Sequence, residues 1–272
     1  MKYSNNEVIH KKIGDIEVLQ FKSLLEYEQD MTHCFTLKHG GYSNGDFESL
    51  NFGTNTGDNL EIVKQNYTKL CENVGFEYTN LFKGKQIHSD KVIFVNNENY
   101  GTFINDQEIE CDGAITNIPN IPLVTNSADC MTVLIYDKKN KYIANIHAGW
   151  QGVLNQIVIK GVNKLVKEGG CNVQDLIICI SPHICTNCFE VMEDVKVRFE
   201  NKFKYSNIIF KKDNEHYLID LETILKNDLL KIGLLNENIH FSGICNKCNI
   251  EDFYSYRASS KTGRMACAIM LK

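Results

Sequence analysis

The chain has 272 residues, of which 43% are hydrophobic and 23% are charged. Such a length and composition suffice for a large buried core and exclude an intrinsically disordered protein. The formal net charge is −5, so we expect no broad basic surface that would bind nucleic acid or an anionic membrane. A small-molecule partner is the remaining expectation.

The N-terminal segment is polar, and the chain has no apolar run of the about 18 residues that a membrane-spanning helix needs. We therefore expect a cytosolic protein. Its 11 cysteines are then expected to be reduced thiols or metal ligands, because disulfides are rare in that compartment. No repeat or low-complexity linker divides the chain, so we expect a single domain over residues 1–272.

Short segments rich in Val and Ile predict strands, which in chain order are 16–21, 91–95, 113–116, 131–136, 142–147, 176–180 and 265–271. One predicted helix begins after the capping residues Asp58 and Asn59 and ends at Gly75. A second is predicted from about Gln151 to the glycines at 169 and 170. Helices and strands intermix along the chain, so the pattern predicts a mixed α/β or α+β layered fold.

The predicted strands 131–136 and 142–147 flank a polar turn at residues 137–140. Folded as a hairpin, they place Cys130 level with His147 to within one residue. The two side chains then become neighbours. A slip of one residue would put them on opposite faces of the hairpin, so the register decides whether they meet.

Three potential metal ligands stand where an apolar strand meets a polar or glycine-containing turn: His88, Cys130 and His147. Two imidazoles and one thiolate form a three-ligand zinc set, which leaves a fourth position for water or substrate and is typical of catalytic zinc. Spacing alone favours three unrelated polar residues at strand ends, and the hairpin adjacency of Cys130 and His147 makes the two interpretations about equally good.

The same residues also permit a metal-free interpretation. Cys130 would then be a nucleophile and His147 its base, with Asp129 or Asp112 orienting the imidazole, as cysteine hydrolases require.

Two Cys-x-x-Cys pairs occur, Cys185 with Cys188 and Cys245 with Cys248. Together they would make a structural zinc site with four cysteine ligands. Their separation is far longer than in a usual zinc ribbon, so spacing favours buried or incidental thiols.

Two polar stretches are candidate substrate contacts. The glycine- and asparagine-rich segment 35–59, which contains Lys38 and Asn51, is too long for a plain turn and is typical of a binding loop. The segment 254–272 combines aromatic side chains with Arg257 and Arg264, which suit an anion such as phosphate. A solvated loop and surface salt bridges are the alternative interpretations.

Five motifs, taken in order, resemble the laccase-domain family, whose members are also called polyphenol oxidase-like proteins or zinc-dependent purine nucleoside phosphorylases. These motifs are QIHSDKV, CDGAIT, the hairpin from NSADCMTVLIYD to NIHAGWQG, SPHICTNCFEV and FYSYRASSKTGRMA. The resemblance runs from about Thr32 to Leu271. It implies a four-layer α/β/β/α sandwich and a zinc bound by His88, Cys130 and His147.

Family members of this kind are described as cleaving adenosine, inosine, guanosine and methylthioadenosine with phosphate, and as deaminating adenosine. Some bacterial members are linked instead to editing of peptidoglycan precursors. This chain departs from the family pattern at two positions, where Lys38 and Gln151 stand in place of the usual arginines. Lysine keeps a positive charge but loses the bidentate fork, so a weaker hold on phosphate is expected.

The resemblance and the residues together predict a zinc enzyme acting on purine nucleosides. Phosphate would be held by Lys38 with Arg257 or Arg264, and the aromatic residues of the last segment would stack on the base. Alternatives are a cysteine-dependent amidase or peptidoglycan-precursor editing enzyme using Cys130 and His147, and a non-catalytic sensor with structural zinc. A copper polyphenol oxidase is disfavoured, because the eight histidines form no His-x-His pair of the kind that copper clusters use.

Overall fold

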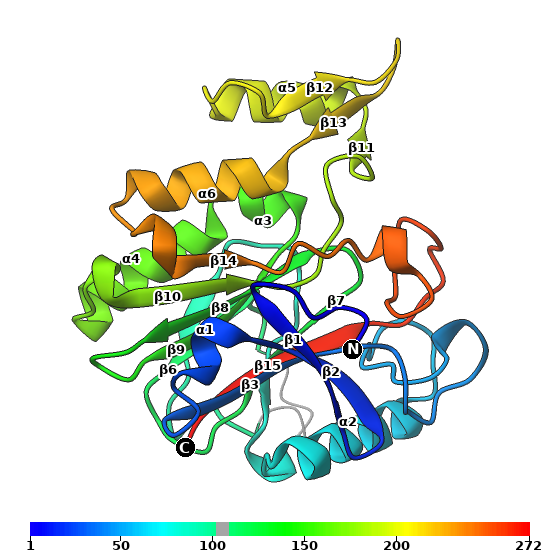
Figure 1. Cartoon of the computed structure of the whole chain (residues 1–272), viewed down its shortest axis with the longest axis vertical. Coiled ribbons are helices and arrows are strands. Elements are labelled where there is room, and N and C mark those ends of the chain that lie inside the picture. The colour runs from blue at the N-terminus through cyan, green and yellow to red at the C-terminus, as the bar shows by residue number, and fades with distance from the viewer. Residues whose placement is uncertain (102–108) are drawn as a thin grey trace.

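The computed structural model describes residues 1–101 and 109–272. Two mixed sheets lie face to face, with helix α2 on the outer face of one and helices α3, α4 and α6 on the outer face of the other (Figure 1). This is the four-layer α/β/β/α sandwich that the family resemblance implies, so that expectation is confirmed. The six α-helices in the described ranges are α1 (Lys22–Leu25), α2 (Leu60–Val74), α3 (Trp150–Leu154), α4 (Ile157–Gly169), α5 (Glu193–Lys202) and α6 (Leu221–Lys231).

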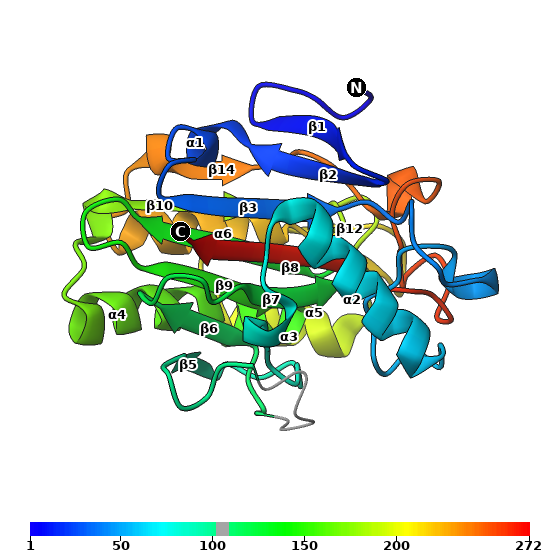
Figure 2. The ribbon, with the colours of Figure 1, turned by 90° about the horizontal axis from the view of Figure 1, so that it is seen from below.

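The first sheet has the strand order β1-β2-β3-β15-β7-β4. Its last strand in sequence lies in the middle of the sheet, where β15 pairs antiparallel with β3 on one side and β7 on the other. Figure 2 shows β15 between these neighbours, with α2 crossing beside it. The bounds are β1 (Val8–Ile13), β2 (Ile16–Phe21), β3 (Met31–Thr36), β4 (Phe82–Lys83), β7 (Leu123–Ser127) and β15 (Met265–Leu271).

The second sheet has the strand order β14-β10-β8-β9-β6-β5. The central hairpin of β8 and β9 is antiparallel, whereas the two outer pairs, β14 with β10 and β5 with β6, are parallel. The bounds are β5 (Val92–Phe94), β6 (Gly113–Thr116), β8 (Met131–Asp137), β9 (Ile143–Ala148), β10 (Leu176–Ile180) and β14 (Ile239–Phe241).

A small third sheet, ordered β11-β13-β12, lies with α5 beyond α6 at one end of the molecule (Figure 1). Its strands are β11 (Glu190–Val191), β12 (Ile209–Lys211) and β13 (Tyr217–Ile219). No helix in the described ranges combines the length and the apolar character that crossing a membrane requires.

Three apolar clusters fill the spaces between the layers. One joins α2 to the first sheet, one lies between the sheets, and one joins the second sheet to the helices above it. Helix α2 shows how the sequence builds such a contact. The Asn59 side chain accepts a hydrogen bond from the Glu61 N–H, and Gly75 ends the helix in the left-handed conformation. Between these ends, Val63, Tyr67 and Leu70 are fully buried against the sheet.

The predicted helix after Gln151 is wrong in one respect, because the segment forms two helices rather than one. Helix α3 ends at Leu154, and Gln156 adopts a left-handed conformation with φ of +58° before α4 begins. A continuous helix cannot include that conformation. The break lets α3 leave the end of β9 at a different angle from α4.

The chain crosses from the first sheet to the second at two places. It passes from β4 to β5 through the loop that contains His88, and from β7 to β8 through Ala128, Asp129 and Cys130. The end of β9, at His147, lies against the second crossing because β8 and β9 are paired. The three predicted ligands therefore gather at one edge of the double sheet.

Candidate metal centre and substrate cavity

The side chains of His88, Cys130 and His147 converge into one cluster. One potential ligand atom from each residue lies within 4.8 Å of the other two. The two imidazole rings are nearly perpendicular, with centroids 5.0 Å apart and an interplanar angle of 84°. His147 is buried, Cys130 is half-buried and His88 is exposed, so the cluster opens to solvent on one side.

The hairpin register that brings Cys130 to His147 differs from the predicted one. Met131 pairs with Ala148 and Thr132 with His147, so Cys130 is displaced by two positions from the residue opposite His147. The predicted offset of at most one residue is therefore wrong. Because side chains alternate with a period of two along a strand, a shift of two keeps both side chains on the same face.

Asp112 orients the buried histidine. Its carboxylate accepts a hydrogen bond from Nδ1 of His147 at 2.9 Å, which leaves Nε2 as the nitrogen that faces Cys130. The same carboxylate accepts the backbone N–H groups of His88 and Ser89 at 3.0 and 2.6 Å. Asp112 thus fixes one ligand directly and the loop of a second ligand through its backbone, as carboxylates behind metal-binding histidines do.

Asp129, the other carboxylate considered for this role, has different partners. One of its oxygens accepts hydrogen bonds from the Ser255 hydroxyl at 3.0 Å and the Arg257 backbone N–H at 2.7 Å. Asp129 therefore holds the segment that carries Arg257, and Asp112 alone of the two orients His147.

The charges of the cluster favour a thiolate beside an imidazolium. Burial opposes ionisation of the Cys130 thiol, but the neighbouring His147 and His88 outweigh it and lower the pKa of Cys130 to about 6. Burial likewise opposes the charged form of His147, but Cys130 and Asp112 raise its pKa to about 9. Without a metal, the Cys130 thiol is therefore mostly deprotonated at neutral pH.

Two residues of this region hold an uncommon backbone conformation. His88 has φ of +57° and Asp129 has φ of +93°, values that side chains with a Cβ adopt at a cost of about 1–3 kcal/mol. The contacts to Asp112 and Ser255 hold these conformations in place.

Gly149 leaves room for the ligands. A Cβ at this position would lie 3.1 Å from both Sγ of Cys130 and Cδ2 of His88. Any larger residue would press on two ligands at once. The glycine that follows His147 and Ala148 is therefore a packing requirement of the cluster.

A cavity of about 670 Å³ opens directly onto the three ligands. This volume lies within the range of about 300–1,000 Å³ typical of small-molecule sites. Side chains from both sheets and from the C-terminal segment form its walls. Besides the ligands, the lining includes Gly53, Thr56, Lys83, Lys85, Gln86, Asn126, Asp129, Trp150, Gln151, Ile184, Phe189, Tyr256, Arg257 and Arg264.

Both predicted arginines line the cavity. The Arg257 guanidinium stacks over Phe189, with its carbon 5.4 Å from the ring centroid, and donates to the Glu190 carbonyl at 2.7 Å. Arg264 stacks in the same way over Tyr256 at 5.7 Å. Stacking and carbonyl contacts orient the two guanidiniums without neutralising their charge.

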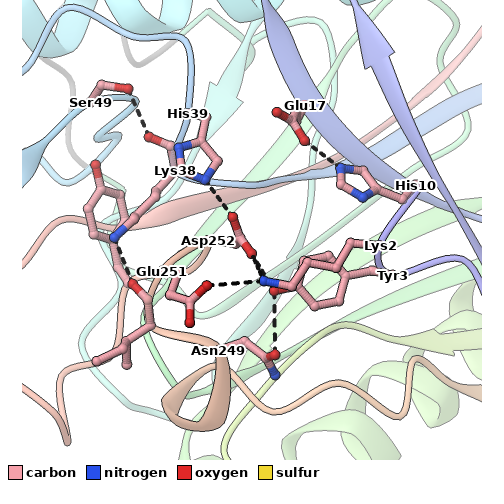
Figure 3. A network of polar contacts seen from close by, with 12 residues as sticks. Lys2, Tyr3, His10, Glu17, Lys38, His39, Ser49, Asn249, Glu251 and Asp252 are labelled. Carbon is pink, nitrogen blue, oxygen red and sulfur yellow. Dashed lines mark hydrogen bonds and ion pairs between the residues drawn. The ribbon is translucent and has the colours of Figure 1, made fainter.

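The other two predicted substrate residues do not line the cavity. Lys38 donates from Nζ to the Ile250 carbonyl at 2.7 Å (Figure 3). Asn51 is fully buried, and its side-chain oxygen accepts the backbone N–H groups of Gly53 and Arg264, both at 2.8 Å. Asn51 therefore positions two cavity residues from behind.

Of the aromatic residues expected to stack on a base, only Tyr256 faces the cavity. Tyr254 is buried and donates its hydroxyl to the Phe47 carbonyl at 2.6 Å. Sequence reasoning did not identify Phe189, Trp150, Lys83 or Lys85 as cavity residues. The HAGW motif contained a signal for Trp150, whereas Lys83 ends the short edge strand β4 and Lys85 follows it, in a stretch that no pattern marks.

Comparisons with known proteins agree on one family. The family model described as multi-copper polyphenol oxidoreductase laccase matches residues 32–272. A purine nucleoside phosphorylase of Bacteroides thetaiotaomicron is 32% identical over 94% of this chain and 97% of its own length. The purine nucleoside phosphorylase YlmD of Bacillus subtilis is 30% identical, covering 88% of this chain and 87% of its own.

Solved structures show the same fold. A Bacillus licheniformis protein titled hypothetical protein YfiH superposes with a TM-score of 0.88 at 27% identity, covering 94% of this chain and 96% of that one. YlmD from Geobacillus stearothermophilus superposes with a TM-score of 0.91 at 23% identity, over 98% and 99% of the two chains.

Proposed function

Because the chain belongs to the multi-copper polyphenol oxidoreductase laccase family, we propose that it is a purine nucleoside phosphorylase, the activity for which its relatives are named, and that it depends on zinc. One observation carries the proposal. A cluster of two imidazoles and one thiolate shares a single cavity with two arginines, each of which stacks on an aromatic ring. Such a cavity suits a substrate with a polar reacting centre and an anionic co-substrate.

The donor set fits zinc. Two imidazoles with one thiolate are common zinc ligands, and a three-residue set leaves a position open to the cavity. In the described ranges, two groups of three or more Cys, His or carboxylate side chains converge closely enough to bind a metal ion. One is this cluster of two histidines and a cysteine, and the second contains only cysteines. A cluster of several coppers needs more imidazoles than His88 and His147 provide.

Phosphate is assigned to the arginine side of the cavity. Arg257 and Arg264 provide two oriented guanidiniums, which match the geometry of phosphate oxygens. The base is assigned to the aromatic faces of Tyr256 and Phe189, next to the same arginines. Lys38 is left out of this assignment because it lies outside the cavity lining.

A ribose hydroxyl is assigned to Asp129. Its Oδ1 is buried and has no hydrogen-bond partner in the described part of the chain, while the residue lines the cavity. A buried acceptor without a partner is costly, and a sugar hydroxyl would satisfy it. This feature favours a nucleoside over a free base as the substrate.

The roles of the chain's own groups follow from this placement. Zinc supplies a Lewis acid when bound. Asp112 keeps the His147 proton on Nδ1, so that Nε2 faces the cluster. The arginines hold the attacking anion in place, and Ile184 and Phe189 exclude water from one wall. Deamination of adenosine is included in the proposal as a second reaction of the same cavity, with water in place of phosphate.

A cysteine hydrolase is the second candidate. One observation favours it, since the lowered pKa of Cys130 beside His147 and Asp112 resembles the charge state of a nucleophilic cysteine with its base. The family relatives and the two arginines favour the phosphorylase. A chelator distinguishes the two, because a cysteine hydrolase keeps its activity after the metal is removed.

The test is chromatographic product analysis with metal-analysed protein. Incubation with inosine and phosphate should release hypoxanthine and a sugar phosphate, and omission of phosphate should abolish this release. Adenosine without phosphate should give inosine and ammonia. Chelation should remove both activities, and added zinc should restore them. Rapid oxidation of a phenol with no reaction of any nucleoside would overturn the proposal, as would full activity in metal-free protein.

A further inference from the structure

The two Cys-x-x-Cys pairs come together in space. Cys185, Cys188, Cys245 and Cys248 place all four sulfurs within 4.8 Å of one another. Spacing along the sequence argued against this arrangement, since Cys188 and Cys245 are separated by α5, α6 and the small third sheet. None of the four residues belongs to the cluster of His88, Cys130 and His147.

The sheet explains why the pairs meet. Strands β10 and β14 are parallel neighbours with Ile180 opposite Phe241. The two segments that follow these strands therefore leave the sheet at the same edge and in the same direction. The pairing continues beyond the strands, where the His183 N–H donates to the Ile244 carbonyl at 3.1 Å and the Asn246 N–H donates back to His183 at 3.2 Å. Each Cys-x-x-Cys pair begins within five residues of its strand.

Each pair is folded into a tight turn that aims both sulfurs inward. The Cys188 N–H donates to the Cys185 carbonyl at 2.9 Å, and the Asn249 side chain donates to the Cys245 carbonyl at 2.8 Å. The Cys185 backbone N–H also points at Sγ of Cys245, 3.3 Å away. A peptide N–H directed at sulfur stabilises a thiolate, which is the form that binds metal.

The dimensions match one tetrahedral ion. Four sulfurs at about 2.3 Å from a zinc ion lie roughly 3.8 Å from one another. Sγ of Cys188 lies 3.5 Å from Sγ of Cys248, and the remaining separations stay within 4.8 Å. A disulfide has an S–S distance of about 2.05 Å, and it would join only two of the four sulfurs.

We propose that Cys185, Cys188, Cys245 and Cys248 form a second metal site, which binds one structural zinc ion. Four protein ligands leave no position for a substrate, as is usual for structural zinc. Three of the cysteines are half-buried and Cys248 is exposed, so the ion can enter from solvent after folding.

The site joins two segments that form one wall of the cavity. Ile184 and Phe189, which line the cavity, flank the first pair, and Arg257 donates to the Cys188 carbonyl at 3.4 Å as well as to Glu190. The ion would thus fix the wall beside Arg257 without taking part in the reaction.

The experiment counts metal in two pairs of variants. Wild-type protein purified without added metal should contain about two zinc ions per chain. The Cys245→Ser/Cys248→Ser variant should lose one of them, and the His88→Ala/His147→Ala variant should lose the other. Cys171→Ser, which changes a buried cysteine outside both clusters, should keep both ions.

Two further measurements avoid dependence on a variant that fails to fold. In wild-type protein, alkylation mapped by mass spectrometry should spare all four cysteines until a chelator is added. Cys248→His should keep the ion, because imidazole also binds zinc, whereas Cys248→Ala should weaken its retention. The His88→Ala/His147→Ala protein should retain only this ion, and its melting temperature should fall when a chelator removes the ion.

Three results would overturn the inference. They are an unchanged metal content in a folded Cys245→Ser/Cys248→Ser variant, disulfides among these cysteines in freshly purified protein, or iron in place of zinc. None of these readouts uses enzyme activity, so the inference is independent of the proposed function.

Discussion

The carboxylate of Asp112 lies 2.9 Å from Nδ1 of His147 and at the same time accepts the backbone N–H of His88. One buried side chain thus sets the orientation of a ligand on a strand and the conformation of the loop that carries another ligand. The contact follows from the pairing of β6 with β9, in which Gly113 lies opposite Ile146. Removing the carboxylate should therefore affect the metal before it affects the fold.

We predict that Asp112→Asn lowers zinc affinity by about 10- to 100-fold, the range found when such supporting carboxylates are replaced. An amide can present its NH₂ group to Nδ1, which would favour the tautomer with the proton on Nε2 and so block metal binding. Competition with a chromogenic chelator measures the affinity. Asp228→Asn removes another buried carboxylate, one bonded to Gln156 and Tyr205, and should leave the zinc affinity unchanged. Equal affinities for the wild type and Asp112→Asn would contradict this role.

The charge state of Cys130 gives a pH-dependent prediction. In metal-free protein the thiolate fraction should stay high as pH falls to about 6, the lowered pKa of Cys130, and decline below it. An ordinary thiol loses its thiolate below about pH 8.5. Iodoacetamide labelling of the Cys130 peptide, followed by mass spectrometry across this pH range, checks the profile. Saturating zinc should suppress labelling at every pH.

The matched variant for this experiment is His147→Ala. It removes the main group that offsets the effect of burial on Cys130, so the labelling profile should move toward higher pH. A profile that is the same in both proteins would show that His147 does not set the thiol's pKa. A covalent adduct with a substrate on Cys130, in zinc-free and fully active protein, would favour the cysteine hydrolase instead.

The two cavity arginines should differ from the third arginine of the chain. Arg257→Met and Arg264→Met each remove a guanidinium that faces the cavity, and loss of a charged hydrogen bond costs about 1.5–3 kcal/mol. The KM for phosphate should therefore rise by roughly 10- to 150-fold, with a small change in melting temperature. Arg198→Met is the control, because Arg198 does not line the cavity, although it stacks on Trp150, which does. Equal loss of stability and activity in all three would indicate structural salt bridges.

Local patterns were sufficient where structure is decided by neighbours in the chain. The cap at Asn59 and the stop at Gly75 match helix α2, and four predicted strands, including those at Ile16–Phe21 and Leu176–Ile180, have the predicted bounds. The break at Gln156 was not predictable, since no sequence pattern requires a left-handed glutamine there. The pattern of β-branched residues also does not predict very short strands such as β4.

Contacts between distant segments were harder to predict. The hairpin predicts part of the cluster of His88, Cys130 and His147. A register shift of two residues leaves the Cys130 and His147 side chains on the same face, so the error in the predicted offset did not separate them. The four cysteines were judged by their sequence separation, although the parallel pairing of β10 and β14 decides their proximity. Lys38 stands where the family pattern has an arginine, which predicts a contact with phosphate, but its ammonium group binds the carbonyl of Ile250 in the segment that precedes the cavity residues.

The segment that contains Ile250 is bound to the N-terminus of the chain through Asp252. Its carboxylate accepts hydrogen bonds from the Tyr3 hydroxyl at 2.5 Å, Lys2 at 2.6 Å and the His39 ring at 2.7 Å (Figure 3). Burial opposes ionisation of Asp252, but these donors outweigh it and hold the pKa of its carboxyl well below the usual value. The network anchors the chain just before Tyr256 and Arg257 enter the cavity wall.

A carboxyl whose pKa is lowered by folding stabilises the protein above its unfolded pKa, about 3.9 for aspartate, and this contribution is lost as pH falls through the folded value. We predict that Asp252→Asn lowers the free energy of unfolding by about 1–3 kcal/mol at pH 7. The difference from wild type should shrink below about pH 4, because Asp252 of the unfolded wild-type chain then binds a proton while the folded carboxyl stays ionised. Urea unfolding at several pH values measures both effects.

Asp46→Asn, which breaks the exposed ion pair with Lys261, is the control and should change the free energy of unfolding by less than about 0.5 kcal/mol. A stability difference for Asp252→Asn that does not vary with pH would mean that packing, rather than the carboxylate charge, holds this segment.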